Sequence, residues 1–436
     1  MTPLMAGLIG FVALFALLAL RMPIGLAMIL VGAGGIAVLN SPSAAMNVLG
    51  AFPYSYSAVF SLSVVPLFVL MGAFATVSGM GTGLYKTAYS WVGHRRGGLA
   101  SATILSCAGF AALSGSSIAA AATMGKVSLP EMERYKYDAG LATGSIAAGG
   151  TLGILIPPST VLIVYALLTE QSVGRLFLAG FLPGLLLTLL FVGTVIIVTT
   201  LNPAAGPTGP RTPLKERLKV LVNSGALVFI VTIVIGGIYT GVFTVAEAAS
   251  VGAFLTFLHA LWSRKLTLQR FFAALLDTIR TTAMVFFILI GAHFFAPFLA
   301  LTRIPMNLAT SIGELAVPAL AILLIIIAVY IVLGTFMEGF AMLVLTVPIV
   351  LPIITTLGYD PIWFGIIMVV VVEMGLISPP VGMNVFVVKG VAQHVPLGQI
   401  YRGIIPFWIA MAVCVFLLIL FPDIALYLPN TMMGRG

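Results

Sequence analysis

The sequence contains few of the residues that build catalytic and metal sites in soluble proteins. Only 7% of its 436 residues are charged, and it has two cysteines and four histidines. Both cysteines, Cys107 and Cys414, lie in apolar runs, which predicts core packing as small hydrophobic residues. Metal-ligand spacings and a G-x-x-x-x-G-K-S/T phosphate loop are absent. We therefore expect no enzymatic activity, no ATP hydrolysis, no resident cofactor and no nucleic-acid partner.

Apolar sequence is abundant instead, at 61% of the residues. A helix that crosses a bilayer needs about 20 predominantly apolar residues, and segments of this kind recur along the whole chain. The fold class predicted from this pattern is an all-α polytopic membrane protein with no room for a soluble domain. The expected spans are 4–20, 24–39, 58–80, 176–200, 221–239, 246–262, 271–301 and 404–428, with a Ser/Pro/Asn loop after residue 39 and an interfacial segment at 81–91.

One motif occurs twice in the chain. Gly153-Ile-Leu-Ile-Pro-Pro-Ser159 has a degenerate copy, Gly375-Leu-Ile-Ser-Pro-Pro-Val381, about 220 positions later. Each copy interrupts an apolar segment, at 138–168 and at 361–388, with a Pro-Pro pair that a helix does not cross cleanly. In a bilayer, broken helices persist only where they line a protein-enclosed or wet cavity. Two of them at matching positions predict the binding site of a transporter.

Two other segments are predicted to form re-entrant hairpins. The first has arms at 97–113 and 118–124 around the tip Ser114–Ser117, and a charged loop is expected at 126–136. The second has arms at 315–333 and 340–354 around the tip Gly334–Gly339. We expect the two tips and the two Pro-broken helices to converge near the midplane of the membrane.

The distribution of Lys and Arg predicts the orientation. Placing Arg95 and Arg96 in the cytoplasm puts most basic residues there, including those of the linker Asn202–Lys219, and explains much of the net charge of +8. Both termini are then external, and the hairpins enter from opposite sides, which makes the repeat inverted. The expected organisation is scaffold helices at 1–80, a first repeat at 81–200, the linker at 201–220, scaffold helices at 221–301 and a second repeat at 302–436.

The tips and breaks carry oxygen atoms that suit a hard cation. Helix C-termini and unwound carbonyls favour cations, and sodium prefers oxygen ligands. The candidate side chains are Ser114, Ser116, Ser117, Thr335, Ser378 and the amide of Asn384. The structural alternative is that each serine bonds only to its own backbone.

Two acidic residues at membrane depth are candidates for function. Glu338 lies at the second tip, and Glu373 precedes the second Pro-Pro pair by six residues. Either can be a cation ligand, a proton carrier or a structural hydrogen-bond partner. Glu247 is expected at the interface, and Arg280 is expected to snorkel or to pair within the scaffold.

The tract Gly-Phe-Ala-Ala-Leu-Ser-Gly-Ser-Ser-Ile-Ala from Gly109, together with the two Pro-Pro motifs, resembles the large membrane subunit of tripartite ATP-independent periplasmic (TRAP) transporters. The resemblance covers nearly the whole chain. It implies a sodium-driven importer of an organic acid, such as a C4-dicarboxylate or sialic acid, in the bacterial inner membrane. It also implies a periplasmic binding protein that delivers substrate, a small four-helix membrane subunit, and a scaffold with an elevator-type transport domain.

The same resemblance places the site residues. It implies a first sodium site at Ser114, Gly115, Ser116, Ser117, Gly153 and Pro157, a second at Thr335, Glu338, Ser378, Pro379, Gly382 and Asn384, and a substrate vicinity at Ser116, Ser159, Thr160, Met337 and Met383. In a bacterial inner membrane, the external side on which both termini are predicted is the periplasm. Two alternatives stay open: a stand-alone sodium/dicarboxylate symporter of related fold, and a channel or membrane scaffold, which the localised breaks disfavour.

Overall fold

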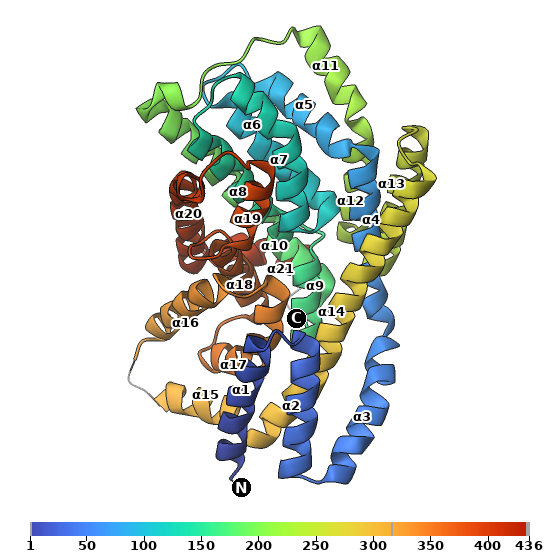
Figure 1. Cartoon of the computed structure of the whole chain (residues 1–436), viewed down its shortest axis with the longest axis vertical. Helices are drawn as coiled ribbons and strands as arrows, with labels where there is room; N and C mark the ends of the chain where they lie inside the picture. Colours follow the sequence, from blue (N-terminus) through green and yellow to red (C-terminus); the bar gives the residue numbers. More distant parts are fainter. Residues whose placement is uncertain (1, 315–316, 433–436) are drawn as a thin grey trace.

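The computed structural model describes residues 2–314 and 317–432, and within these ranges the chain is built from helices without strands (Figure 1). The fold class predicted from the sequence is therefore confirmed. The expected start of a hairpin arm at Leu315, and the terminal residues Met1 and 433–436, lie outside the described residues.

The elements before the linker hold the first hairpin and the first broken helix. Their bounds are α1 Pro3–Ala19, α2 Ile24–Leu39, α3 Pro42–Ser57, η1 Phe60–Ser63, α4 Val64–Ser78, α5 Met80–Val92, α6 Gly98–Ser114, α7 Ser117–Arg134, α8 Ala139–Leu155, α9 Thr160–Thr169 and α10 Val173–Leu201. The axes of α8 and α9 differ by 41° across the Pro-Pro break.

The later elements repeat this plan. Their bounds are η2 Pro203–Ala205, α11 Leu214–Asn223, α12 Gly225–Tyr239, α13 Val245–Trp262, α14 Leu268–Thr302, α15 Ile304–Glu314, α16 Ala319–Gly334, α17 Gly339–Thr356, α18 Pro361–Leu376, α19 Met383–Val391, α20 Leu397–Leu420 and α21 Asp423–Met432. Six described helices are long and apolar enough to cross a membrane, and up to eight spans result if each bent pair counts as one. The chain is thus a multi-span membrane protein.

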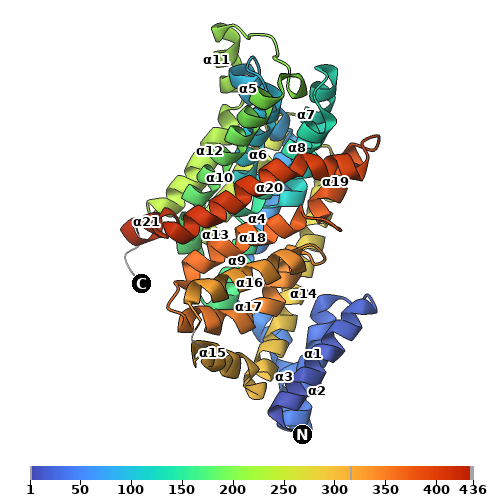
Figure 2. The same cartoon turned by 90° about the vertical axis from the view of Figure 1, so that its left-hand side faces the viewer.

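The helices pack in two groups. In the first, which we call the framework, α14 packs along α2 and α4, α13 packs on α4, and α1 and α12 complete the layer. In the second, the hairpin body, α8 contacts α6, α7 and α20, while α10 contacts α20 and α18 contacts α16. The framework contacts the hairpin body through α4 with α6 and through α14 with α17. Figure 2 shows α20 crossing the front of the hairpin body, below α7 and α8 and above α16 and α17.

The expected Ser/Pro/Asn loop after residue 39 is wrong, because this segment forms helix α3. Ser41 caps the helix by accepting a hydrogen bond from the backbone N–H of Ala44 at 3.2 Å. Pro42 occupies the first helical turn, where its missing N–H costs nothing. The Ser-Pro pair therefore starts a helix here, and Phe52 packs its ring against Phe294 of α14.

The charged loop expected at 126–136 is also wrong, because α7 continues through it to Arg134. Met124, Ser128 and Met132 are buried at helical spacing, while Lys126 and Glu133 face outward. The charges thus form the polar side of an amphipathic helix. The second arm of the first hairpin is consequently 18 residues long, not the short arm expected.

Two predicted boundaries also change. The last span ends at Leu420 instead of residue 428, because Pro422 stops the helix and disfavours helical geometry at Phe421. The linker Asn202–Lys219 is not wholly irregular, since its end forms the start of α11. Its middle is held to the hairpin body: the Gly206 carbonyl accepts from the Gly97 N–H at 2.9 Å, and the Gly209 N–H donates to the Gly93 carbonyl at 3.0 Å.

Candidate ion and substrate site

The first hairpin tip lies against the first helix break. Gly115 ends α6 in the left-handed conformation, with φ of +57°, and its carbonyl accepts a hydrogen bond from the Thr160 hydroxyl at 3.0 Å. A Cβ on Gly115 would lie 2.8 Å from the Pro158 carbonyl oxygen. A side chain at this position would therefore separate the tip from the break.

Gly153 makes a second contact of this kind. A Cβ at this position would lie 2.6 Å from the Ser116 carbonyl oxygen and 3.0 Å from the Ser117 nitrogen. The last turn of α8 thus touches the tip, which brings Gly153 together with Ser116 and Ser117. Pro157 faces a different neighbour, because its ring packs near Gly180 of α10.

The hydroxyls around the first junction fall into two classes. Ser116 and Ser159 are helix caps, whose oxygens each accept a backbone N–H, from Ala119 and Leu162, at 3.3 Å. The Ser114 oxygen is buried without a hydrogen-bond partner in the described chain. A cap oxygen keeps a free lone pair, so Ser116 can serve both a helix and an ion.

The second junction has the same plan with different chemistry. The Gly382 N–H approaches the Thr335 carbonyl at 3.5 Å, and a Cβ on Gly375 would lie 2.6 Å from the Cα of Gly334. Ser378 donates to the Met374 carbonyl at 2.6 Å. The predicted residues Thr335, Ser378, Pro379 and Gly382 thus lie at one junction, with Met337 and Met383 half-buried beside it.

Two aromatic residues of α20 donate hydrogen bonds to this junction, and the sequence does not predict them as site residues. The Trp408 indole N–H donates to the Ser378 oxygen at 3.0 Å, and the Tyr401 hydroxyl donates to the Val381 carbonyl at 2.7 Å. Both also line a cavity of about 510 Å³ with Thr335 and Pro379. Nothing in the local sequence of α20 indicates that its aromatic side chains reach the break.

Glu338 is the residue immediately before α17, the N-cap position, which Ser116 occupies at α7. Its half-buried carboxyl lies near the backbone N–H groups of Phe340 and Ala341. A carboxylate at a helix N-terminus is stabilised by the free N–H groups there. The position is consistent both with a cap and with a ligand at the second tip.

Asn384, which is predicted for the second site, extends from that junction toward the first hairpin tip. Its amide nitrogen approaches the Glu373 carboxylate at 3.4 Å, and the Ser117 side chain lies beside the same carboxylate. Asn384 therefore joins the second broken helix to the first hairpin tip. In the described ranges the one ion pair, His394 with Glu133, is elsewhere, and neither Glu338 nor Glu373 has a basic partner.

Comparison with known proteins identifies the molecule that carries this geometry. Residues 11–424 match the family model of the tripartite ATP-independent periplasmic transporter, DctM component. The chain belongs to this family.

Relatives in the family are named as large permeases. The chain is 41% identical over 372 residues to the C4-dicarboxylate TRAP transporter large permease protein DctM of Pseudomonas aeruginosa, covering 85% of this chain and 86% of that one. It is 33% identical over 419 residues to the sialic acid TRAP transporter large permease protein SiaM of Vibrio cholerae, covering 95% and 96%.

A solved structure shows the same fold. The YdaH transporter of Alcanivorax borkumensis aligns with a TM-score of 0.61 at 14% identity, covering 88% of this chain and 90% of that one. The family and the named relatives are transporters and permeases, which agrees with the expectation of a non-enzyme.

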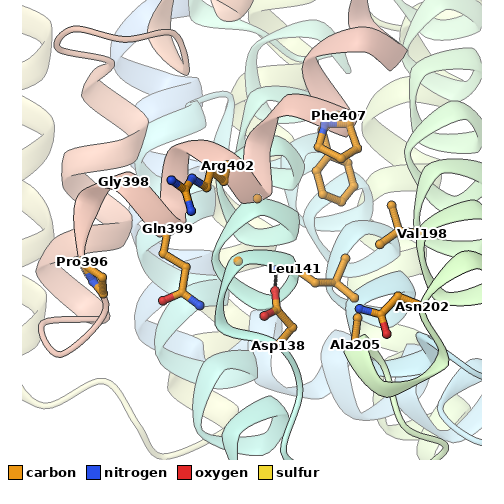
Figure 3. Close-up of a pocket in the computed structure, with 13 residues that line it drawn as sticks. Asp138, Leu141, Val198, Asn202, Ala205, Pro396, Gly398, Gln399, Arg402 and Phe407 are labelled. Atoms are coloured by element: carbon orange, nitrogen blue, oxygen red, sulfur yellow. Dashed lines mark hydrogen bonds between the residues drawn. The ribbon is translucent and has the colours of Figure 1, made fainter.

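A separate cavity of about 640 Å³ lies at the other end of α8 (Figure 3). Asp138, which caps α8, and Gln399 and Arg402 of α20 line it. Helix α8 has 17 residues and so is about 25 Å long, with the Pro-Pro break at its far end. The cavity is therefore not part of the first junction.

Proposed function

We propose that this chain is the sodium-coupled, secondary active importer subunit for an organic acid in the bacterial inner membrane. A periplasmic binding protein delivers the substrate, and a small four-helix membrane subunit packs beside this chain. The substrate class, a C4-dicarboxylate, sialic acid or a similar carboxylate, is supported by the names of the relatives.

The observation that carries this proposal is the pair of junctions in one packed body. Each consists of a hairpin tip that contacts a Pro-broken helix, at Gly153 with Ser116 and at Gly375 with Gly334. Broken helices present unpaired carbonyls at membrane depth, and these suit sodium. A sodium ion at each junction offsets part of the charge of an organic anion held between them.

The packing also supports an elevator mechanism. Both junctions belong to the hairpin body, so they move together if that body slides along the framework. The contacts that this motion must exchange include those of α4 with α6, of α14 with α17 and of α12 with α10. The framework helix α14, of 35 residues, is long enough to remain in contact during such a displacement.

Reconstitution tests the proposal. Proteoliposomes with this chain and its small subunit, supplied with a loaded binding protein, should take up substrate when an inward sodium gradient is imposed. Equal uptake in potassium would contradict sodium coupling. Saturable uptake by the chain alone would instead favour the stand-alone symporter.

A further inference from the structure

A group of buried oxygen atoms lies between the two repeats and is not accounted for by hydrogen bonding. The Glu373 side chain is 1% exposed and Asn384 is 0% exposed. Oε1 of Glu373 and Oδ1 of Asn384 have no hydrogen-bond partner in the described part of the chain. Buried acceptors without donors are rare in folded proteins and each requires a physical explanation.

The three side chains of this group come from three helices. Glu373 belongs to α18, Asn384 to α19, and Ser117, which is 2% exposed, to the first turn of α7 at the first hairpin tip. The helices α7 and α19 pack against each other, and the Ser117 side chain lies beside the Glu373 carboxylate. The group therefore spans the first and second repeats.

An ionised Glu373 would lack a counter-charge within the described ranges. A buried carboxylate is costly unless it is paired, and no Lys, Arg or His of the described ranges forms an ion pair with Glu373. The Asn384 amide supplies one long hydrogen bond, at 3.4 Å, to Oε2. Carboxylate, amide and hydroxyl oxygens together form a hard, oxygen-only ligand set with one negative charge.

We infer that Glu373, Asn384 and Ser117 bind a further sodium ion, separate from those at the two junctions. This inference rests on the proposed function. The ion neutralises the carboxylate and occupies the unpartnered oxygens at the same time, which the neutral side chains of Asn384 and Ser117 do not do. It also links the first hairpin tip to the second broken helix, so these two parts of the hairpin body are held together only when the ion is bound.

The expected consequence is a coupling ratio one sodium ion higher than two junctions supply. A body that lost this ion would carry an unpaired buried charge through the membrane, which is unfavourable. Glu373 would thus prevent the empty body from moving without its ion.

The test uses the assembled transporter in proteoliposomes, with the reversal potential giving the number of sodium ions per substrate. Glu373→Gln should transport with one sodium ion fewer. Ser117→Ala, which leaves the charge intact, should require at least fivefold more sodium for half-maximal uptake. Glu170→Gln, which alters an exposed acid after α9, is the matched control and should behave as wild type.

Three results separate the possible failures. Sodium-independent uptake by the wild type would overturn the proposed function and this inference with it. A sodium-dependent wild type, with an unchanged ratio in Glu373→Gln and unchanged sodium requirement in Ser117→Ala, would overturn this inference alone. A changed pH dependence in Glu373→Gln with an unchanged sodium ratio would assign the carboxyl to a proton and also overturn it.

Thermal melting of the purified chain keeps the test decisive if Glu373→Gln folds poorly. Sodium chloride, compared with potassium chloride, should raise the melting temperature of wild type more than that of Ser117→Ala. Equal sodium-dependent shifts in these two proteins would contradict the site.

Discussion

The backbone of Gly140 in α8 lies directly against Gly403 in α20, so closely that a Cβ on Gly403 would overlap the Gly140 carbonyl. A Cβ on Gly144, one turn further along α8, would in turn overlap the Gly403 carbonyl. Small residues allow helix backbones to approach in membranes, where packing replaces the hydrophobic driving force. This contact holds the last long helix to the first broken helix.

Gly403→Val should therefore separate α8 from α20. The obstructing atoms belong to the Gly140 backbone and not to a flexible side chain. We therefore expect the free energy of unfolding to fall by about 1–3 kcal/mol or more. Thermal melting of the purified chain measures the loss. Gly398→Ala on the same helix is the control, because nothing lies within 4 Å of its Cβ position. Equal melting temperatures for the two variants would show that the close contact is absent in the membrane.

Gly153→Ala and Gly375→Ala should weaken the two junctions independently. Each added methyl group would lie 2.6 Å from a backbone atom of the facing tip, Ser116 O or Gly334 Cα. The tip must move away from the break, so both variants should need more sodium for half-maximal uptake. Gly193→Ala in α10, with nothing within 4 Å of its Cβ position, should leave sodium dependence unchanged. A control that changed as much as the junction variants would point to general loss of helix packing.

Ser116→Ala distinguishes a helix cap from an ion ligand. Ser116 caps α7, and Ser172 caps α10 in the same way from an exposed position, accepting the Arg175 N–H at 3.4 Å. Loss of either cap should cost about 1 kcal/mol of stability. Only Ser116→Ala should also raise the sodium requirement, by about five- to 150-fold for a lost ligand of roughly 1–3 kcal/mol. Uptake against sodium concentration, with melting in parallel, gives the answer. Matching sodium curves would make Ser116 a cap alone.

The breaks and tips could be predicted from the sequence because their causes are local. A helix does not cross a Pro-Pro pair cleanly, so Pro157-Pro158 and Pro379-Pro380 mark the two interruptions directly. The repeat strengthens both predictions, since each copy supports the other. The first tip needs only Gly115, whose left-handed conformation favours glycine.

The contacts between the repeats could not be predicted in this way. Asn384 follows the second Pro-Pro pair in the sequence, and its side chain lies with Glu373, beside which Ser117 of the first repeat also lies. That arrangement depends on how α19 packs on α7, which no local pattern specifies. The aromatic donors from α20 to the second break, Tyr401 and Trp408, depend on the same long-range packing.

Orientation in the membrane is the remaining prediction, and two exposed positions test it. Thr208 is in the linker between α10 and α11, which the positive-inside rule places in the cytoplasm. Ser43 is in the first turn of α3, one span after Arg21, and is predicted on the periplasmic side. The native Cys107 and Cys414 are fully buried and can be replaced by Ala to remove background labelling.

In intact cells, a membrane-impermeant maleimide should label Ser43→Cys and should not label Thr208→Cys. In permeabilised cells, both Ser43→Cys and Thr208→Cys should be labelled. The linker is hydrogen-bonded to the turns at Gly93 and Gly97, so one accessible position reports the side of that whole surface. Labelling of Thr208→Cys from outside, with Ser43→Cys protected, would reverse the orientation of both hairpins. The first tip would then enter from the periplasm, and the order in which the two junctions meet external sodium would be exchanged.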